Sequence, residues 1–365
     1  MSTDTVLKLA SSSKFITTIA VLQAVERGLV GLDDDVAQYV PVLAEQEVLQ
    51  GFAWYGKPRT VKRTKKITLR HLLTQTAGTG YDFLPIQPIA RYKTWNRMPI
   101  GQGDYIDDRM AYPLLHEPGL GWTYGSSMTW AGKVLEKVSG MTLDEWTSKH
   151  ICEPLGLTSV TFFPGEELEP RMADVVYRHW WSGKLLHLPG MRQPESEKEA
   201  LGGESCFASM DDLMAVLQSL LMDDEKLLKK ETTAMMFSPQ LDDMQRQGLW
   251  ECLDKPVWIC QTILKKGEYD WGVGGVLING DSHECLQRGT LMWSGLFHVL
   301  WVSLTAIAFW SVWGGRLMVK QWIDRKSGVS GVFGTQLLPG TDKIVVPLIG
   351  DFQREVYRRF HAKEY

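Results

Sequence analysis

The order of helical and strand patterns along the chain constrains its fold more than any other feature. Apolar residues recur at helical spacing in the first part of the chain, beginning with residues 11–27. Strand patterns come late: residues 269–278, a turn at 279–281 and residues 287–301 predict a long antiparallel hairpin. Helices in the middle and strands near the end predict an α+β fold, in which helices flank an antiparallel sheet and a helical lobe is inserted.

The remaining elements are predicted from the same patterns. Ser209 is the expected N-terminal cap of a helix over residues 210–222. Residues 81–122 are rich in proline, glycine and aromatic residues, which predicts long, shaped loops. The other predicted helices are residues 67–74, 126–139, 143–151 and 347–360, and a short strand is predicted at 331–336.

Length and composition predict a globular protein. A chain of 365 residues with 44% hydrophobic and 22% charged residues can bury a large core. Its formal net charge of −4 gives no global field that would gather nucleic acid, so no nucleic-acid partner is expected. Residues 57–66 are locally basic, and we interpret them as a solvated connection, with an acidic partner as the alternative.

Cysteine usage and the N-terminal residues bear on location and metals. The five cysteines are odd in number and never spaced as CxxC, which indicates neither a disulfide framework nor a zinc site. The first residues lack a basic region followed by an apolar core, so no secretory signal is visible. We therefore expect a cytoplasmic protein without a bound metal.

Residues 296–313 form an uncharged apolar stretch near the lower limit for a membrane span. A transmembrane helix is one reading. Polar residues dilute the stretch, and it begins inside a predicted strand, so a buried strand followed by extra sequence is favoured. A membrane partner is therefore not expected.

The chain lacks a GxSxG elbow, an HExxH motif, a P-loop and a complete GxGxxG. Ser11 and Lys14 are instead spaced to share one face at the start of a helix. The positive end of that helix favours an alkoxide over an ammonium, and desolvation could let Lys14 lose its proton and act as a base for Ser11. The alternative is an ordinary polar helix start.

Two further motifs could complete such a site. Tyr124-Gly125-Ser126 precedes a predicted helix, and its phenol could relay a proton if Lys14 lowers the pKa of Tyr124. Trp293-Ser294-Gly295 lies in a predicted strand, whose edge could offer a backbone N–H to a tetrahedral intermediate. Taken separately, Tyr124 is more typical of a packing tyrosine, and Trp293-Ser294-Gly295 is compatible with ordinary strand packing.

In this order, Ser-x-x-Lys, Tyr-x-Ser and the small-residue strand motif resemble the serine β-lactamase and penicillin-binding protein superfamily. The sequence is most similar in pattern to class C β-lactamase-related esterases and fungal acyltransferases of the lovastatin transesterase type. Blocks such as "ITLRHLLTQTAGTGYDF", "EPGLGWTYGSSMTWAGKVLEKVSGMTLDEW" and "IDRKSGVSGVFGTQLLP" carry the resemblance. It implies a β-lactamase/transpeptidase-like fold for a single domain over residues 1–365. About 33–200 would form the mainly helical lobe and loops, and about 201–365 with the N-terminal helix the α/β part.

The resemblance also implies roles for the motif residues. Ser11 would form the acyl-enzyme, with Lys14 and Tyr124 as the base system. The backbone N–H groups of Ser11 and Leu296 would form the oxyanion hole, and Ser126 would orient the substrate or Lys14. Trp293 stands where true β-lactamases usually have the lysine of Lys-Thr-Gly, which favours an esterase or acyltransferase over antibiotic hydrolysis.

The implied reaction is transfer of an acyl group from a thioester or ester to an alcohol through Ser11. We therefore expect a serine acyltransferase of fungal secondary metabolism that needs no cofactor. Its acceptor would be a polyketide-like small molecule, and its donor an acyl-CoA or an acyl carrier domain. The alternatives are a carboxylesterase of the same family and a truncated, non-catalytic remnant.

The sequence departs from the family pattern in two places. Members normally have a longer segment before the Ser-x-x-Lys helix, so the first strands of the sheet are expected to be missing here. Residues 302–321 are an atypical apolar insertion, and deleting them joins Trp301 to Trp322 in what resembles the uninterrupted family strand pair. We interpret the insertion as a translated intron.

Overall fold

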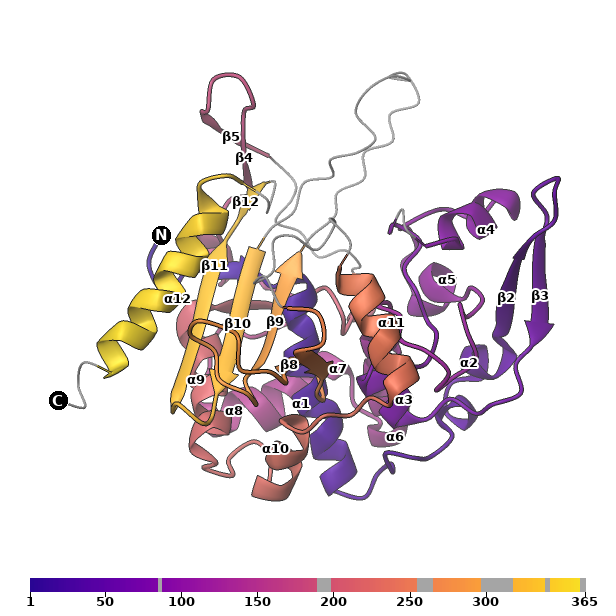
Figure 1. Ribbon diagram of the computed structural model, residues 1–365, viewed down its shortest axis with the longest axis horizontal. Coiled ribbons are helices and arrows are strands. Elements are labelled where there is room, and N and C mark those ends of the chain that lie inside the picture. The colour runs from indigo at the N-terminus through magenta and orange to yellow at the C-terminus, as the bar shows by residue number, and fades with distance from the viewer. Residues whose placement is uncertain (85–86, 189–197, 255–264, 297–317, 339–341, 362–365) are drawn as a thin grey trace.

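The computed structural model describes residues 1–84, 87–188, 198–254, 265–296, 318–338 and 342–361 (Figure 1). Its centre is a sheet of five strands in the order β11-β10-β9-β8-β7, in which every neighbouring pair is antiparallel. The strands are β7 (Tyr269–Trp271), β8 (Val276–Ile278), β9 (Leu291–Leu296), β10 (Met318–Asp324) and β11 (Val329–Thr335). The predicted α+β fold with an antiparallel sheet flanked by helices is confirmed.

Both faces of the sheet are covered by helices. On one face lie α1 (Ser13–Glu26) and α9 (Met210–Met222), and on the other lies α12 (Val345–His361), drawn in yellow in front of β11 in Figure 1. Side chains of a strand alternate between the two faces. Accordingly, Trp322 of β10 contacts Phe352 of α12, while the neighbouring Gln321 and Phe15 of α1 line one small cavity.

The predicted hairpin is more broken than its sequence suggested. Residues 269–278 form two paired strands, β7 and β8, rather than one strand. The reason is the run from Gly272 to Gly275, where the Gly272 N–H donates to the Gly275 carbonyl and Gly274 has a φ of +93°. A positive φ of this kind is readily adopted by glycine, and it turns the chain back on itself.

The helix predicted at 11–27 begins differently. A 3₁₀ turn over Ala10–Ser12 precedes α1, which starts at Ser13. Ser209 caps α9 as predicted, because its side chain accepts from the Asp212 N–H. Residues 81–122 are not only loops, since they contain α4 (Ile89–Trp95) and α5 (Ile106–Met110).

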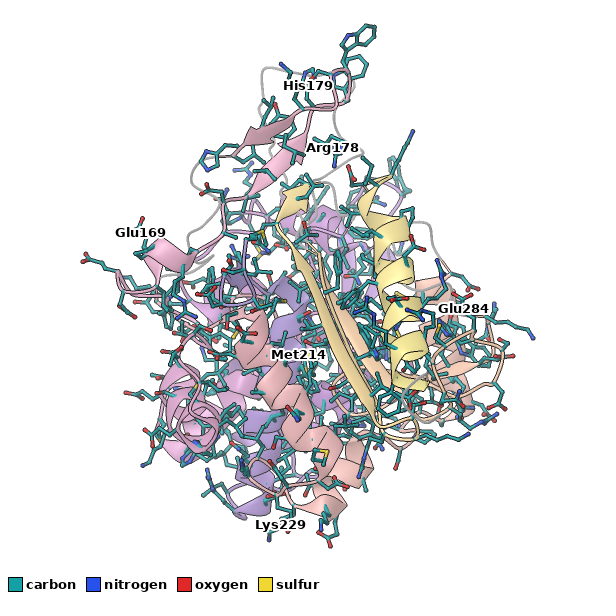
Figure 2. The ribbon with its side chains drawn as sticks, turned by 90° about the vertical axis from the view of Figure 1, so that its left-hand side faces the viewer. Glu169, Arg178, His179, Met214, Lys229 and Glu284 are labelled. Carbon is teal, nitrogen blue, oxygen red and sulfur yellow. The ribbon has the colours of Figure 1, made fainter. Side chains whose placement is uncertain are left out.

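The other elements surround this core. The basic residues 57–66, interpreted as a connection, include β3, which pairs with β2 in a hairpin. Figure 2 shows β4 and β5 projecting from the body of the protein, with Arg178 and His179 near their tip. The remaining elements are β1 (Val6–Lys8), α2 (Pro41–Glu45), β2 (Glu47–Phe52), β3 (Pro58–Lys62), α3 (Leu69–Leu73), α6 (Ser127–Ser139), α7 (Leu143–Thr147), a π-helical turn (Ser148–Cys152), α8 (Glu153–Leu155), β4 (Val176–Arg178), β5 (Leu185–His187), β6 (Phe207–Ser209), α10 (Lys230–Met236), α11 (Asp243–Leu253), β12 (Leu337–Leu338) and 3₁₀ turns at Val36–Gln38 and Glu169–Arg171.

The last residues of the predicted insertion at 302–321 belong to the sheet. Residues 318–321 form the first half of β10 and pair with β9, because the ladder needs a partner for Trp293 to Leu296. The rest of the insertion lies outside the described residues, as does most of the apolar stretch at 296–313. Within the parts that the structure describes, no helix is long and apolar enough to cross a membrane.

Candidate active site

Ser11 lies in the 3₁₀ turn immediately before α1, and this turn packs against β9. Its Oγ accepts a hydrogen bond of 2.6 Å from the Tyr124 hydroxyl and lies 3.2 Å from the Nζ of Lys14. The Ser11 residue is 8% exposed, so the group is nearly enclosed. The structure therefore brings together three residues that are up to 113 positions apart in the sequence.

Lys14 is almost fully buried and has two further partners. Its Nζ donates to the carbonyl of Gly203 at 2.8 Å and to the hydroxyl of Tyr81 at 3.1 Å. The same nitrogen lies 4.8 Å from the centre of the Tyr124 ring. A neutral amine has two N–H bonds and one lone pair. If Gly203 and Tyr81 accept the two N–H bonds, the lone pair is directed at Ser11.

Sequence reasoning missed Tyr81 and Gly203. Both stand in family-like blocks, "TAGTGYDF" and "GGESC", which gave the resemblance but no role for single residues. Two tyrosines and a carbonyl oxygen around one buried lysine can be found only once the fold brings the three segments together.

Burial raises the pKa of the Tyr124 phenol, and the hydrogen bond with Ser11 only partly opposes this effect. The sequence-based expectation was the opposite, a pKa lowered by Lys14, and it is wrong because it neglected desolvation. A phenol that keeps its proton is a hydrogen-bond donor. The base at this site is therefore better sought in Lys14 than in Tyr124.

The motif Trp293-Ser294-Gly295 lies in β9, on the other side of Ser11. The Trp293 ring is 5.2 Å from the Tyr124 ring, centre to centre, and Ser294 is buried. A side chain on Gly295 would overlap the carbonyl oxygen of Leu9, so only glycine lets β9 approach the turn that carries Ser11. The backbone of Leu296 pairs with Met318, and its role in an oxyanion hole stays a prediction.

Ser126 does not contact the candidate base. It is buried at the start of α6, where its N–H donates to the Gly80 carbonyl. Among the described residues no hydrogen bond joins Ser126 to Lys14, and Tyr81 provides the polar contact instead. A role for Ser126 in orienting Lys14 is therefore not supported, while a role towards substrate stays a prediction.

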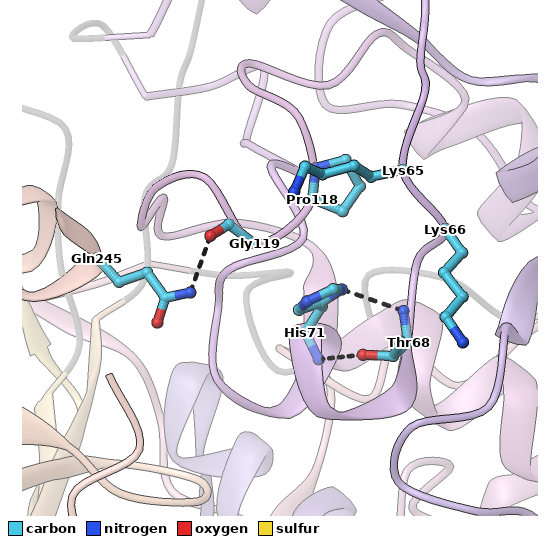
Figure 3. Close-up of a pocket in the computed structure, with 7 residues that line it drawn as sticks. All are labelled: Lys65, Lys66, Thr68, His71, Pro118, Gly119 and Gln245. Carbon is cyan, nitrogen blue, oxygen red and sulfur yellow. Dashed lines mark hydrogen bonds between the residues drawn. The ribbon is translucent and has the colours of Figure 1, made fainter. Parts of the chain in front are cut away.

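Figure 3 shows a surface pocket of about 400 Å³ beside α3, with Lys65 and His71 in its wall. The His71 ring there serves the helix, because its Nδ1 accepts from the Thr68 N–H in a capping box. None of the predicted site residues lines this pocket. Across the described residues there is also no group of three or more side chains that could hold a metal ion.

Comparisons with known proteins show the family of the chain. The model of the Beta-lactamase family matches residues 1–301. Acyltransferase mokF of Monascus pilosus is 34% identical over 83% of this chain and 75% of its own length. Monacolin J acid methylbutanoyltransferase of Aspergillus terreus is 31% identical over 99% of this chain and 84% of its own length. Lovastatin esterase of Penicillium rubens is 33% identical over 98% of this chain and 86% of its own length.

A solved structure of a related enzyme has a similar fold. The LovD6 mutant of simvastatin synthase from Aspergillus terreus superposes with a TM-score of 0.84 and 31% identity, covering 99% of this chain and 83% of that one. The fold is that of the serine β-lactamase and penicillin-binding protein superfamily. The chain belongs to the Beta-lactamase family, and the relatives it resembles there are acyltransferases and esterases.

Proposed function

We propose that this protein is an acyltransferase in which Ser11 carries the acyl group. The observation that carries the proposal is the contact of Ser11 Oγ with both Tyr124 and Lys14, at 2.6 and 3.2 Å. Lys14 accepts the Ser11 proton as Oγ attacks the carbonyl carbon of a thioester or ester. The thiolate or alkoxide that leaves takes a proton from the Tyr124 hydroxyl, which Lys14 replaces.

In the second half of the reaction an alcohol takes the place of the leaving group. Its oxygen attacks the acyl-enzyme, its proton passes to the same pair of residues, and Ser11 is released. The N–H groups of Ser11 and Leu296 are our candidates for the donors to the oxyanion in both steps. Trp293, Ser294 and Ser126 would line the acyl and acceptor side of the site.

For the acceptor we propose a polyketide-like alcohol, because the relatives include a monacolin J acid methylbutanoyltransferase that matches 99% of this chain. The donor would be an acyl-CoA or an acyl group on a carrier domain. No cofactor is needed for this chemistry. The four cysteines among the described residues are free thiols, in keeping with a reducing compartment, and we propose a cytoplasmic location.

Hydrolysis is the second candidate, because lovastatin esterase is 33% identical over 98% of this chain. The two reactions share the acyl-enzyme and differ only in whether an alcohol or water attacks it. Incubation with a small acyl thioester, with and without an alcohol, separates them. An ester product supports the transferase, and free acid alone supports the esterase.

The test of the proposal itself is the intact mass of the protein after incubation with the thioester. We expect the mass of one acyl group to be added to the unchanged protein and to be missing in Ser11→Ala. Ser12→Ala is the matched control, since Ser12 is also buried but bonds to the Val319 carbonyl instead of Lys14. An acyl group that persists in Ser11→Ala, or never forms in the folded unchanged protein, contradicts the proposal.

A further inference from the structure

Four charged side chains are buried behind the partners of Lys14. They are Asp82, Lys93, Arg109 and Glu204, and none is more than 8% exposed. We call them the buried charge chain. Lys93 Nζ lies 2.6 Å from the Asp82 carboxylate, and Arg109 lies 3.8 Å from Glu204. The two pairs are joined, because Lys93 also donates to the Arg109 carbonyl at 2.8 Å.

Two members of the buried charge chain directly follow, in the sequence, residues that bind Lys14. Asp82 follows Tyr81, whose hydroxyl accepts from Lys14, and Glu204 follows Gly203, whose carbonyl does the same. The two segments come from distant parts of the sequence. Lys93 in α4 and Arg109 in α5 therefore tie together the two places where Lys14 is held.

Further contacts fix the Tyr81 segment. The Gly101 N–H donates to Asp82 at 2.8 Å, and the Tyr112 hydroxyl donates to the Gly80 carbonyl at 2.8 Å. Lys93 Nζ also lies 5.3 Å from the centre of the Tyr112 ring. Buried charges destabilise a fold unless each has a partner, so their pairing leaves these segments little freedom to move.

We propose that the buried charge chain positions the base Lys14, holding Tyr81 and Gly203 so that the amine lone pair is directed at Ser11. This inference rests on the proposed function, in which Lys14 accepts the Ser11 proton. The buried charge chain also keeps its own net charge near zero. The cations of Arg109 and Lys93 offset the carboxylates of Glu204 and Asp82, which would otherwise favour the ammonium form of Lys14.

The groups that face Lys14 define the pH dependence. They are Ser11 in the turn before α1, and Tyr81 and Tyr124 on two loops; Glu204 follows Gly203, whose carbonyl accepts from Lys14. The Glu204 charge already reaches this site, since it adds to burial in raising the pKa of Tyr124, and the Cys252 thiol on α11 is a further titratable group there. Removing the Arg109 cation removes its ion pair with Glu204, so less of the Glu204 charge is offset at this site.

The experiment is the rate of acyl-enzyme formation against pH, measured by intact mass in a single turnover. In Arg109→Met we expect the pH of half-maximal rate to rise by about one unit and the maximal rate to fall about tenfold, with unchanged thioester affinity. In Arg109→Lys the positive charge is kept, so the pH of half-maximal rate should lie close to that of the unchanged protein. In Arg109→Met with Glu204→Gln the charge is balanced again, and the midpoint should return close to that of the unchanged protein.

Controls separate positioning from general damage. Arg178 lies on the projecting strand β4 (Figure 2), and Arg178→Met removes the cation that pairs with another buried carboxylate, that of Asp342. We expect no change of the midpoint there. If Arg109→Met does not fold, by circular dichroism, Glu204→Gln alone carries the test, and its midpoint should fall.

An unchanged midpoint in Arg109→Met, or in Glu204→Gln if that variant carries the test, overturns the inference. So does a midpoint that fails to return in the double variant. These results are distinct from a failure of the proposed function. If the proposed function is wrong, the unchanged protein forms no acyl-enzyme at any pH.

Discussion

The two sides of Ser11 are built very differently. On the Lys14 side, the amine has three hydrogen-bond partners, and the charges behind it are paired. On the strand side, β10 buries Lys320 and Gln321 within the sheet. Neither amide atom of Gln321 has a hydrogen-bond partner. Lys320 has a partner on α12, since its Nζ donates to the Gln353 Oε1 at 3.3 Å. Buried polar groups usually have hydrogen-bond partners, so the Gln321 amide departs from the usual pattern on the strand side.

This difference supports the interpretation of residues 302–321 as an insertion. Deleting them places Val299, Leu300 and Trp301 directly before Trp322, where Val319, Lys320 and Gln321 now stand. The valine is repeated, and both buried polar residues are replaced by apolar ones. Gln321 now adjoins a small cavity between Phe15, Leu217 and Trp293, which a larger apolar side chain would fill.

The largest effect is therefore predicted for deletion of residues 302–321. We expect the free energy of unfolding to rise by about 3–5 kcal/mol, because an unpaired amide and a buried ammonium leave the sheet. Urea denaturation measures the change. Deletion of 302–317 alone keeps Lys320 and Gln321 and should give little gain. Equal gains from both deletions, or a loss of stability in the longer one, would contradict the idea.

A second test directly disturbs the packing of β9 against the turn that carries Ser11. In Gly295→Ala the new methyl group overlaps the Leu9 carbonyl, which is backbone and cannot turn away. We expect β9 to move from Ser11 and acyl-enzyme formation to slow by about 1,000-fold, roughly 4 kcal/mol in the barrier. Gly350→Ala in α12, where the nearest atom would lie at 3.5 Å, is the control and should leave the rate unchanged. A Gly295→Ala protein with normal acylation would show that close approach of β9 is not required.

Lys320 provides a test through pH. Burial lowers the pKa of Lys320 from 10.5 to about 8. Below pH 8 both the folded and the unfolded chain hold the proton, and the full cost of burying the ammonium is present. Between about pH 8 and 10.5 the unfolded chain binds more protons, so stability rises with pH, by up to about 3 kcal/mol.

In Lys320→Met that rise should vanish, and stability at pH 7 should increase by a similar amount. Urea midpoints from pH 7 to 10 measure both effects, since tyrosine ionisation adds its own changes at higher pH. The exposed Lys326→Met is the control and should keep the pH dependence of the unchanged protein. Buried thiols with a raised pKa, such as that of Cys206, oppose this rise in both proteins. A difference in stability between the unchanged protein and Lys320→Met that stays constant from pH 8 to 10 would therefore rule out a buried ammonium on β10.

Sequence patterns predicted the parts of this molecule that depend on local chemistry. The helix of Lys14, the cap at Ser209 and the antiparallel hairpin strands follow from periodicity and capping, and the structure has them. The pairing of Tyr124 with Ser11 needed the family resemblance, because no local rule links residues so far apart. Tyr81 remained hidden for the same reason, and the pKa of Tyr124 was misjudged because burial cannot be read from a motif.

The smallest predicted effect lies on the Lys14 side. The Gln87 side chain links the two tyrosine segments, since its Nε2 donates to the Tyr124 carbonyl at 2.8 Å and its Oε1 accepts from the Tyr81 N–H. In Gln87→Ala both bonds are lost, but Lys14 keeps its own contacts with Ser11 and Gly203. We expect acyl-enzyme formation to slow about fivefold, roughly 1 kcal/mol in the barrier, with unchanged thioester affinity.

Single-turnover rates compare Gln87→Ala with Gln38→Ala, which alters an exposed glutamine of a 3₁₀ turn and should have no effect. Because many contacts share the task on the Lys14 side, loss of one should be tolerated there. On the strand side a single methyl group at Gly295 should not be. If Gln87→Ala slowed acyl-enzyme formation as much as Gly295→Ala, the Lys14 side would depend on the Gln87 side chain alone. Its other hydrogen bonds would then not compensate for the loss of one contact.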